Sequence, residues 1–153
     1  MRKNLSRFRE LSPEEKRAVM RAGLLVAVIR VGLAVLPFRR MLRAVRRAAR
    51  PHTGSRPRSG RPSQFDKDLA VWAVEAAGRR LLTSNPCLPQ ALAVLILFRR
   101  AGEDAELHMG VSRDGDGPFE AHAWIESDGK VVIGGDVPIE GYARLQGLDT
   151  GYL

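Results

Sequence analysis

The residue with the clearest chemical potential is Cys87, the only cysteine in the chain. It lies in the run Ser-Asn-Pro-Cys-Leu-Pro-Gln at 84–90, where a turn passes into an apolar stretch. Ser84 or Asn85 can cap a helix that begins here, and Pro89 is tolerated in its first turn, where amides have no helical partner. The thiol is therefore expected at the positive end of a helix, which favours the nucleophilic thiolate. The alternative is a buried cysteine that serves as a small apolar residue.

A base for this thiol is offered by His122, in the run Glu-Ala-His-Ala-Trp-Ile-Glu at 120–126. The alternation predicts a strand with Glu120, His122, Trp124 and Glu126 on one face. Cysteine hydrolases need a histidine that reaches the thiol and a third group that fixes the imidazole. The alternative for His122 is an ordinary strand histidine on a solvated face. His108 has no acid near it across a hairpin and is interpreted as structural.

The third group depends on the hairpin that follows the histidine. A three-residue loop at 127–129 pairs His122 with Gly134 and brings Asp136 to the same face, diagonal to the imidazole. A two-residue loop would instead turn Asp136 to the other face. The predicted acid is Asp136, and the reserve candidates are Glu126 and Glu120.

Helices come first in this chain and strands follow, which predicts the α+β class. Ser12, Pro13 and Glu15 form a capping-box signal for a helix that stops at Pro37. The remaining predicted helices span 38–50, 65–80 and 87–101, and the predicted strands span 106–112, 119–126 and 130–133. The tail from 136 to 153 is predicted to be a loop that wraps over the sheet.

Charge divides the chain into two parts. Residues 1–62 contain 17 Lys or Arg and 3 Asp or Glu, whereas residues 63–153 contain 8 and 14. This asymmetry predicts a basic helical segment over 1–50, a linker over 51–63 and a catalytic domain over 64–153. No zinc-finger spacing or RNA-binding signature accompanies the arginines, so no nucleic-acid partner is expected. A single cysteine fits a reducing, cytoplasmic compartment.

The helix expected over 13–36 is unusually apolar. Arg21 and Arg30 argue against a membrane span, because a charge near the bilayer centre is costly. Three alternatives stay open: packing against its own domain or a partner protein, weak contact with a membrane surface, and a true span. No metal or cofactor is expected, since one cysteine and three separate histidines cannot supply a zinc site.

Four stretches together resemble a known family: Ser-Asn-Pro-Cys-Leu-Pro-Gln-Ala-Leu from 84, Leu-His-Met-Gly-Val-Ser from 107, Phe-Glu-Ala-His-Ala-Trp-Ile-Glu from 119, and Asp-Gly-Lys-Val-Val-Ile-Gly-Gly from 128. They are similar to the leader peptidases of lasso-peptide biosynthesis, which are related to the C-terminal domain of the microcin-processing protein. That family belongs to the transglutaminase-like, papain-related cysteine proteases. The resemblance covers about residues 64–146, and the basic helical N-terminus followed by a linker also looks like that family.

The resemblance implies a papain/transglutaminase-like core and removal of the leader from a ribosomally made precursor peptide. It implies Cys87 as nucleophile and His122 as general base and later acid. The family's acid lies on the strand after the histidine strand, where this chain has Gly134, so Asp136 is the nearest candidate. The implied partners are the precursor peptide, a small leader-recognition protein and a lasso cyclase, and the apolar helix is a candidate docking surface for one of these proteins.

Two other functions remain open at this point. A transglutaminase-like acyl transferase would form the same acyl-enzyme and pass the acyl group to an amine. A non-catalytic adaptor would use the basic segment to bind a membrane or an acidic partner protein. The first predicts a product with a new amide, and the second predicts an unreactive Cys87.

Overall fold

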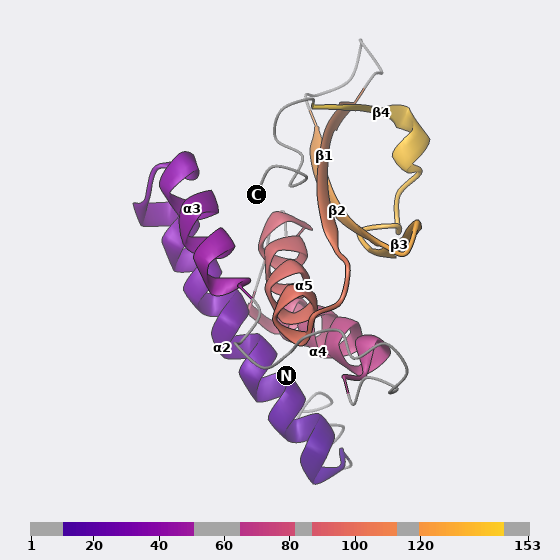
Figure 1. Cartoon of the computed structure of the whole chain (residues 1–153). Coiled ribbons are helices and arrows are strands. Elements are labelled where there is room, and N and C mark those ends of the chain that lie inside the picture. Colours follow the sequence, from indigo (N-terminus) through magenta and orange to yellow (C-terminus); the bar gives the residue numbers. More distant parts are fainter. Residues whose placement is uncertain (1–10, 51–64, 82–86, 113–119, 146–153) are drawn as a thin grey trace.

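The computed structural model describes residues 11–50, 65–81, 87–112 and 120–145. In chain order the elements are α2 (Pro13–Val35), α3 (Phe38–Ala48), α4 (Lys67–Leu81), α5 (Cys87–Ala101), β1 (Glu106–Ser112), β2 (Ala121–Ser127), β3 (Lys130–Ile133), the 3-10 helix η1 (Ile139–Gly141) and β4 (Tyr142–Arg144). The strands form one antiparallel sheet in the order β3-β2-β1-β4, and the helices gather on one side of it (Figure 1). The predicted α+β class is confirmed. The predicted linker at 51–63 and the cap candidates Ser84 and Asn85 lie outside the described residues.

Helix α2 begins and ends where local sequence signals predict. The Ser12 side chain accepts a hydrogen bond from the Glu15 amide at 3.2 Å, and the Glu15 carboxylate accepts one from the Ser12 amide at 2.7 Å. Pro13 occupies the first helical position, the last helical residue is Val35, and the C-cap residue Leu36 precedes Pro37. The predicted capping box and the predicted stop are both confirmed.

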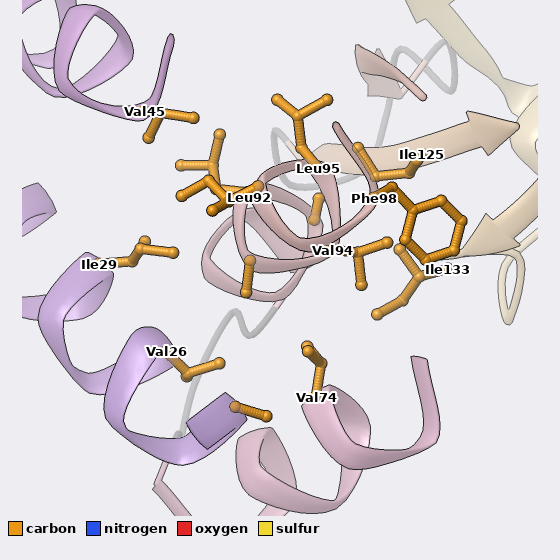
Figure 2. Close-up of a cluster of buried hydrophobic side chains, with 14 of the residues drawn as sticks. Val26, Ile29, Val45, Val74, Leu92, Val94, Leu95, Phe98, Ile125 and Ile133 are labelled. Atoms are coloured by element: carbon orange, nitrogen blue, oxygen red, sulfur yellow. The ribbon is translucent and has the colours of Figure 1, made fainter. Parts of the chain in front are cut away.

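One hydrophobic core joins the helices to the sheet. Figure 2 shows Val26 and Ile29 of α2 facing Val74 of α4 and the α5 side chains, with Ile125 of β2 beyond them. All of these side chains are almost fully buried. One face of α2 therefore packs against its own domain, the first of the three alternatives for this helix. The division at 1–50, 51–63 and 64–153 stays a prediction, although the described parts on both sides of the linker share this core.

Helix α5 is the central element of the core, and its buried side chains reach from α2 to the sheet. It ends at Ala101, where the Glu103 amide donates to the Phe98 carbonyl at 3.0 Å and the Gly102 amide donates to the Arg99 carbonyl at 3.1 Å. Gly102 has φ of 82°, so these bonds form a glycine-ended helix cap. The last turn carries Arg99 and Arg100, whose positive charges favour the C-terminal end of a helix.

The hairpin between β2 and β3 differs from the prediction. Ser127 pairs with Lys130, so the loop has two residues, Asp128 and Gly129, and both have positive φ. These are the residue types that a tight primed turn favours, because Asp and Gly tolerate the left-handed region. The predicted three-residue loop is wrong, and with it the predicted pairing of His122 with Gly134.

A bulge then shifts the register of the same hairpin. Glu126 pairs with Val131, but Ile125 pairs with Ile133, so β3 carries one extra residue between these pairs. The strand ends at Ile133, and Gly134 turns the chain with φ of 83°. A Cβ at Gly134 would lie 2.8 Å from the Ala123 carbonyl oxygen and 2.8 Å from the Trp124 Cβ. The chain can pass this close to β2 only because Gly134 has no side chain.

The tail also differs from the predicted loop. Its described part forms η1 and then β4, which pairs with β1 at the edge of the sheet, with Tyr142 opposite Ser112 and Arg144 opposite Gly110. Gly110 permits this approach, because a Cβ there would lie 2.8 Å from the Tyr142 Cβ and 3.3 Å from the Trp124 ring. The tail thereby becomes part of the sheet that carries His122.

Lys67 fixes the start of α4 against the hairpin turn. Its ammonium lies 2.8 Å from the Asp128 carboxylate and 2.9 Å from the Glu103 carboxylate. The hydrogen bond to Asp128, followed by that to Glu103, raises the pKa of Lys67 above its usual value. This contact holds the helical layer in register with the β2–β3 turn.

Candidate functional site

A cleft of about 930 Å³ brings the three predicted site residues together. Cys87 lines it from the first residue of α5, His122 from β2, and Asp136 from the segment after β3. The reserve candidate Glu120 also lines the cleft, whereas Glu126 does not. The cleft is large enough to accept an extended peptide segment, since small-ligand pockets have volumes of about 300–1,000 Å³.

Cys87 is half-buried and has a free thiol at the N-terminal end of α5. The backbone amides of the first helical turn have no carbonyl partner within the helix, so they present positive partial charge in this region. Both a thiolate and the oxyanion of a tetrahedral intermediate are stabilised by such an environment.

His122 is held by a backbone carbonyl. Its Nε2 atom lies 2.7 Å from the Gly134 oxygen. A carbonyl oxygen can only accept, so Nε2 carries the proton and donates it, and in the neutral ring Nδ1 has the free electron pair. The imidazole is therefore fixed in the tautomer in which Nδ1 can act as a base.

Two aromatic rings complete the environment of the imidazole. The His122 ring stacks on Trp124, with centroids 6.1 Å apart and planes at 16°, and lies 5.4 Å from the Tyr142 ring. Tyr142 also lines the cleft. Its sequence signal is weak, because β4 is three residues long, too short for an alternating pattern to be recognised.

The described residues contain no hydrogen bond between the Cys87 thiol and the His122 imidazole. Proton transfer therefore requires the two side chains to approach each other across the cleft. Catalytic hydrogen bonds are often long or absent before substrate binds, and they tighten in the substrate complex.

Glu126, one of the two reserve acids, belongs to a different cluster. Its carboxylate accepts hydrogen bonds from Trp124 at 3.0 Å and Arg144 at 2.8 Å, and it lies 3.5 Å from the His108 ring. Partial burial alone would raise the pKa of Glu126, but the Trp124 hydrogen bond, the His108 ring when it is protonated, and the Arg144 guanidinium hold it below its usual value. The expectation that no acid lies near His108 is wrong, because the carboxylates of Glu106 and Glu126 lie 3.6 Å and 3.5 Å from its ring. His108 is 6% exposed and stacks on Trp124.

Gln90 is a cleft residue that the sequence analysis did not single out. It lies one helical turn after Cys87, and its amide occupies the space that a side chain at Gly78 would fill. Gly78 on α4 is buried, so the missing side chain makes room for a polar group beside the thiol. The sequence gives no signal of this contact, because Gly78 and Gln90 lie on different helices and belong to no recognisable motif.

No metal site is present in the described ranges, where no three His, Cys, Asp or Glu side chains lie close enough to hold an ion. The expectation that the protein uses no metal or cofactor stays a prediction.

The cleft rim carries an ion pair between Glu75 and Arg79 at 3.6 Å. Both side chains are largely exposed, so this pair adds little to stability.

Comparison with known proteins identifies one family. The model of the transglutaminase-like superfamily matches residues 32–147, which include α3, the cysteine helix and the whole described sheet. No curated protein and no solved structure matches the chain. The match begins inside α2 and so includes part of the segment that the sequence analysis assigned to a separate N-terminal unit.

Proposed function

Because the chain belongs to the transglutaminase-like superfamily, we propose that it is a cysteine endopeptidase that removes the leader from a ribosomally synthesised lasso precursor peptide. The observation that carries the proposal is the cleft that Cys87 and His122 share. The sequence resemblance to lasso leader peptidases supports the choice of substrate. The superfamily itself supports only the coarser activity, acyl-enzyme chemistry at a cysteine.

The first chemical step uses the free electron pair of His122 Nδ1. This atom accepts the proton of the Cys87 thiol, and the thiolate attacks the carbonyl carbon at the leader–core junction. The Cys87 backbone amide, at the start of α5, stabilises the oxyanion of the tetrahedral intermediate. His122 then returns its proton to the leaving amine, which is the new N-terminus of the core peptide.

The second step releases the leader. Its C-terminal carbonyl is now bonded to the Cys87 sulfur as a thioester. His122 takes a proton from water, the hydroxide attacks the thioester, and the leader leaves with a free carboxylate while the thiol is restored. The core peptide thus gains the free amine that a cyclase needs for ring closure. A leader-recognition protein and a lasso cyclase are the partners that this proposal requires, in the cytoplasm.

The third member of the site is assigned to the Gly134 carbonyl and not to Asp136. The carbonyl oxygen already accepts the Nε2 proton at 2.7 Å, the role that an acid has in a catalytic triad. A backbone oxygen can orient the ring but carries no full negative charge. Asp136 lines the cleft.

The decisive experiment combines the purified protein with the precursor peptide and the leader-recognition protein, and follows products by mass spectrometry. The wild type should give free leader and free core, and Cys87→Ala should give neither. His108→Gln, at the histidine outside the cleft, is the matched control and should still cleave once its folding is verified by circular dichroism. Unchanged cleavage by Cys87→Ala would refute the proposal.

An acyl transferase is the second candidate, because the superfamily match is compatible with a cysteine protease and with an acyl transferase. It shares the first step, but an amine replaces water in the second. Its product is the leader acyl group joined to the amine through a new amide. Hydrolysis instead gives the free leader, whose carboxyl group contains the oxygen of one added water. The same mass spectra therefore separate the two activities.

A further inference from the structure

The outer face of α2 is apolar and uncovered. Five large aliphatic side chains on this face are 59–70% exposed: Met20, Leu24, Val28, Val31 and Val35. Their spacing of three and four residues places them along one side of the helix, opposite the side buried against α4 and α5. We call these five residues the outer stripe. Exposed apolar surfaces of this kind mark protein or membrane contact sites.

The charge around the outer stripe is mainly positive. Residues 16–50 contain ten Lys or Arg and no Asp or Glu. Arg17 and Arg21 are exposed and lie on the same side of α2 as the stripe, near its N-terminal end. Glu14 and Asp66 line the same hollow as these two arginines, and no acid follows in α2 beyond Glu15. An apolar stripe in a mainly basic surface complements a surface that is anionic and apolar beneath.

Helix α3 extends the basic surface. It lies beside α2, with Met41 packed against Gly32, and it buries Met41, Leu42 and Val45 towards the core. Its arginines are all exposed, at positions 39, 40, 43, 46 and 47. Figure 1 shows α2 and α3 next to each other, on the side of α5 that faces away from the sheet. Helix α2 packs against α4 and α5, and α3 packs against α5, while the outer stripe and the α3 arginines are exposed.

We infer that this helical layer binds the surface of an anionic phospholipid membrane, with the outer stripe in the headgroup region and the arginines on lipid phosphates. The inference goes beyond the proposed peptidase chemistry and does not depend on Cys87. A nucleic acid would satisfy the arginines but leave the outer stripe in water. A protein partner would need an apolar groove of matching shape with acidic residues around it. An anionic membrane combines negative charge with apolar lipid and needs no matching shape.

Surface binding fits the structure better than a span. Helix α2 is long and apolar enough to cross a membrane by length and composition. A span would remove Val19, Ala22, Val26 and Ile29 from the core and place Arg30 among lipid tails. Binding at the surface keeps the inner face packed and uses only the face that is already exposed.

The test uses the full-length protein and co-sedimentation with vesicles of phosphatidylcholine, with and without phosphatidylglycerol, at about 0.1 M salt, where the Debye length is about 10 Å. The protein should bind the anionic vesicles and not the neutral ones. The triple variant Leu24→Gln/Val28→Gln/Val31→Gln should bind at least about tenfold more weakly. The variant Arg43→Gln/Arg46→Gln/Arg47→Gln should lose about a hundredfold, with weaker salt dependence.

Matched controls separate lost binding from lost folding. Leu24→Met/Val28→Leu/Val31→Leu keeps the outer stripe apolar, and Arg100→Gln removes an exposed charge from α5. Both should bind like the wild type, and all variants should melt as it does by circular dichroism. Equal binding to neutral vesicles, or anionic binding unchanged in the glutamine triple variant, would overturn the inference. A third outcome would also overturn it: the wild type is a dimer, the glutamine triple variant is a monomer, and neither protein binds vesicles. The outer stripe would then be the contact with a second copy of the chain.

Discussion

The two described sheet histidines flank the same tryptophan but differ in their surroundings. His108 stacks on one side of Trp124 among the carboxylates of Glu106 and Glu126. His122 stacks on Trp124 as well, but it donates to a backbone carbonyl and lines the cleft that contains Cys87. His108 therefore lies beside two carboxylates, whereas His122 shares the cleft with the nucleophile. The number of carboxylates around an imidazole does not identify the catalytic histidine in this protein.

The largest expected effect separates the two histidines directly. His122→Ala should lower the rate of leader removal by about 10³-fold, since a positioned acid–base group contributes about 10² to 10⁴. His108→Gln should leave kcat nearly unchanged and lower the melting temperature, because His108 is buried against Trp124. Single-turnover cleavage assays and thermal melts measure the two quantities. Similar losses of activity in both variants would abolish the distinction.

The next effect tests the carbonyl that holds His122. Gly134→Ala should lower activity by about 10²-fold, because the new Cβ collides with Ala123 and Trp124 and moves the carbonyl. Gly129→Ala is the matched control. That glycine also has positive φ, at 72°, but its Cβ would have open space around it. Both variants should lose stability from backbone strain, and only the first should lose activity when assayed well below its melting temperature.

A change in the acid cluster around His108 should alter the free energy of unfolding and leave the rate of cleavage unchanged. The pKa of Glu126 is lowered in the folded protein, since the Trp124 hydrogen bond and nearby positive charges outweigh partial burial. Its contribution is therefore present above the pKa of an unfolded glutamate and is lost as pH falls through the lower folded value. Glu126→Gln should cost about 1–2 kcal/mol of unfolding free energy at neutral pH and less in acid. Urea titrations at several pH values measure this difference, and an equal cost at every pH would contradict it.

The smallest expected effect concerns Asp136. Asp136→Asn should change the cleavage rate by about a factor of two, the range of an exposed substitution outside the reacting groups. The Gly134 carbonyl accepts the imidazole proton in its place. A loss as large as that of His122→Ala would instead make Asp136 the third catalytic group.

The sequence predicts much of the helical layer, because its signals are local. Ser12, Pro13 and Glu15 define the start of α2, and Pro37 ends it. Each of these features depends on residues within one or two helical turns, so the pattern alone contains the information.

The site is less predictable, because it depends on contacts between distant elements. Cys87 and His122 have recognisable motifs, and both line the cleft. The partner of His122 depends on a two-residue turn and a bulge in β3, and no residue pattern in 130–136 indicates that bulge. Tyr142 reaches the imidazole only through the pairing of β4 with β1. An acid was expected where a glycine carbonyl accepts the proton, because side chains can be read from a sequence and backbone geometry cannot.

The most direct test of the central claim is the rate at which iodoacetamide alkylates Cys87 at neutral pH in the wild type, His122→Ala and His108→Gln. Cys87 is the only cysteine, so the adduct measured by mass spectrometry reports this thiol alone. If His122 accepts the thiol proton, alkylation should be fast in the wild type and in His108→Gln and markedly slower in His122→Ala. Equal rates in all three proteins would show that the imidazole does not activate the sulfur.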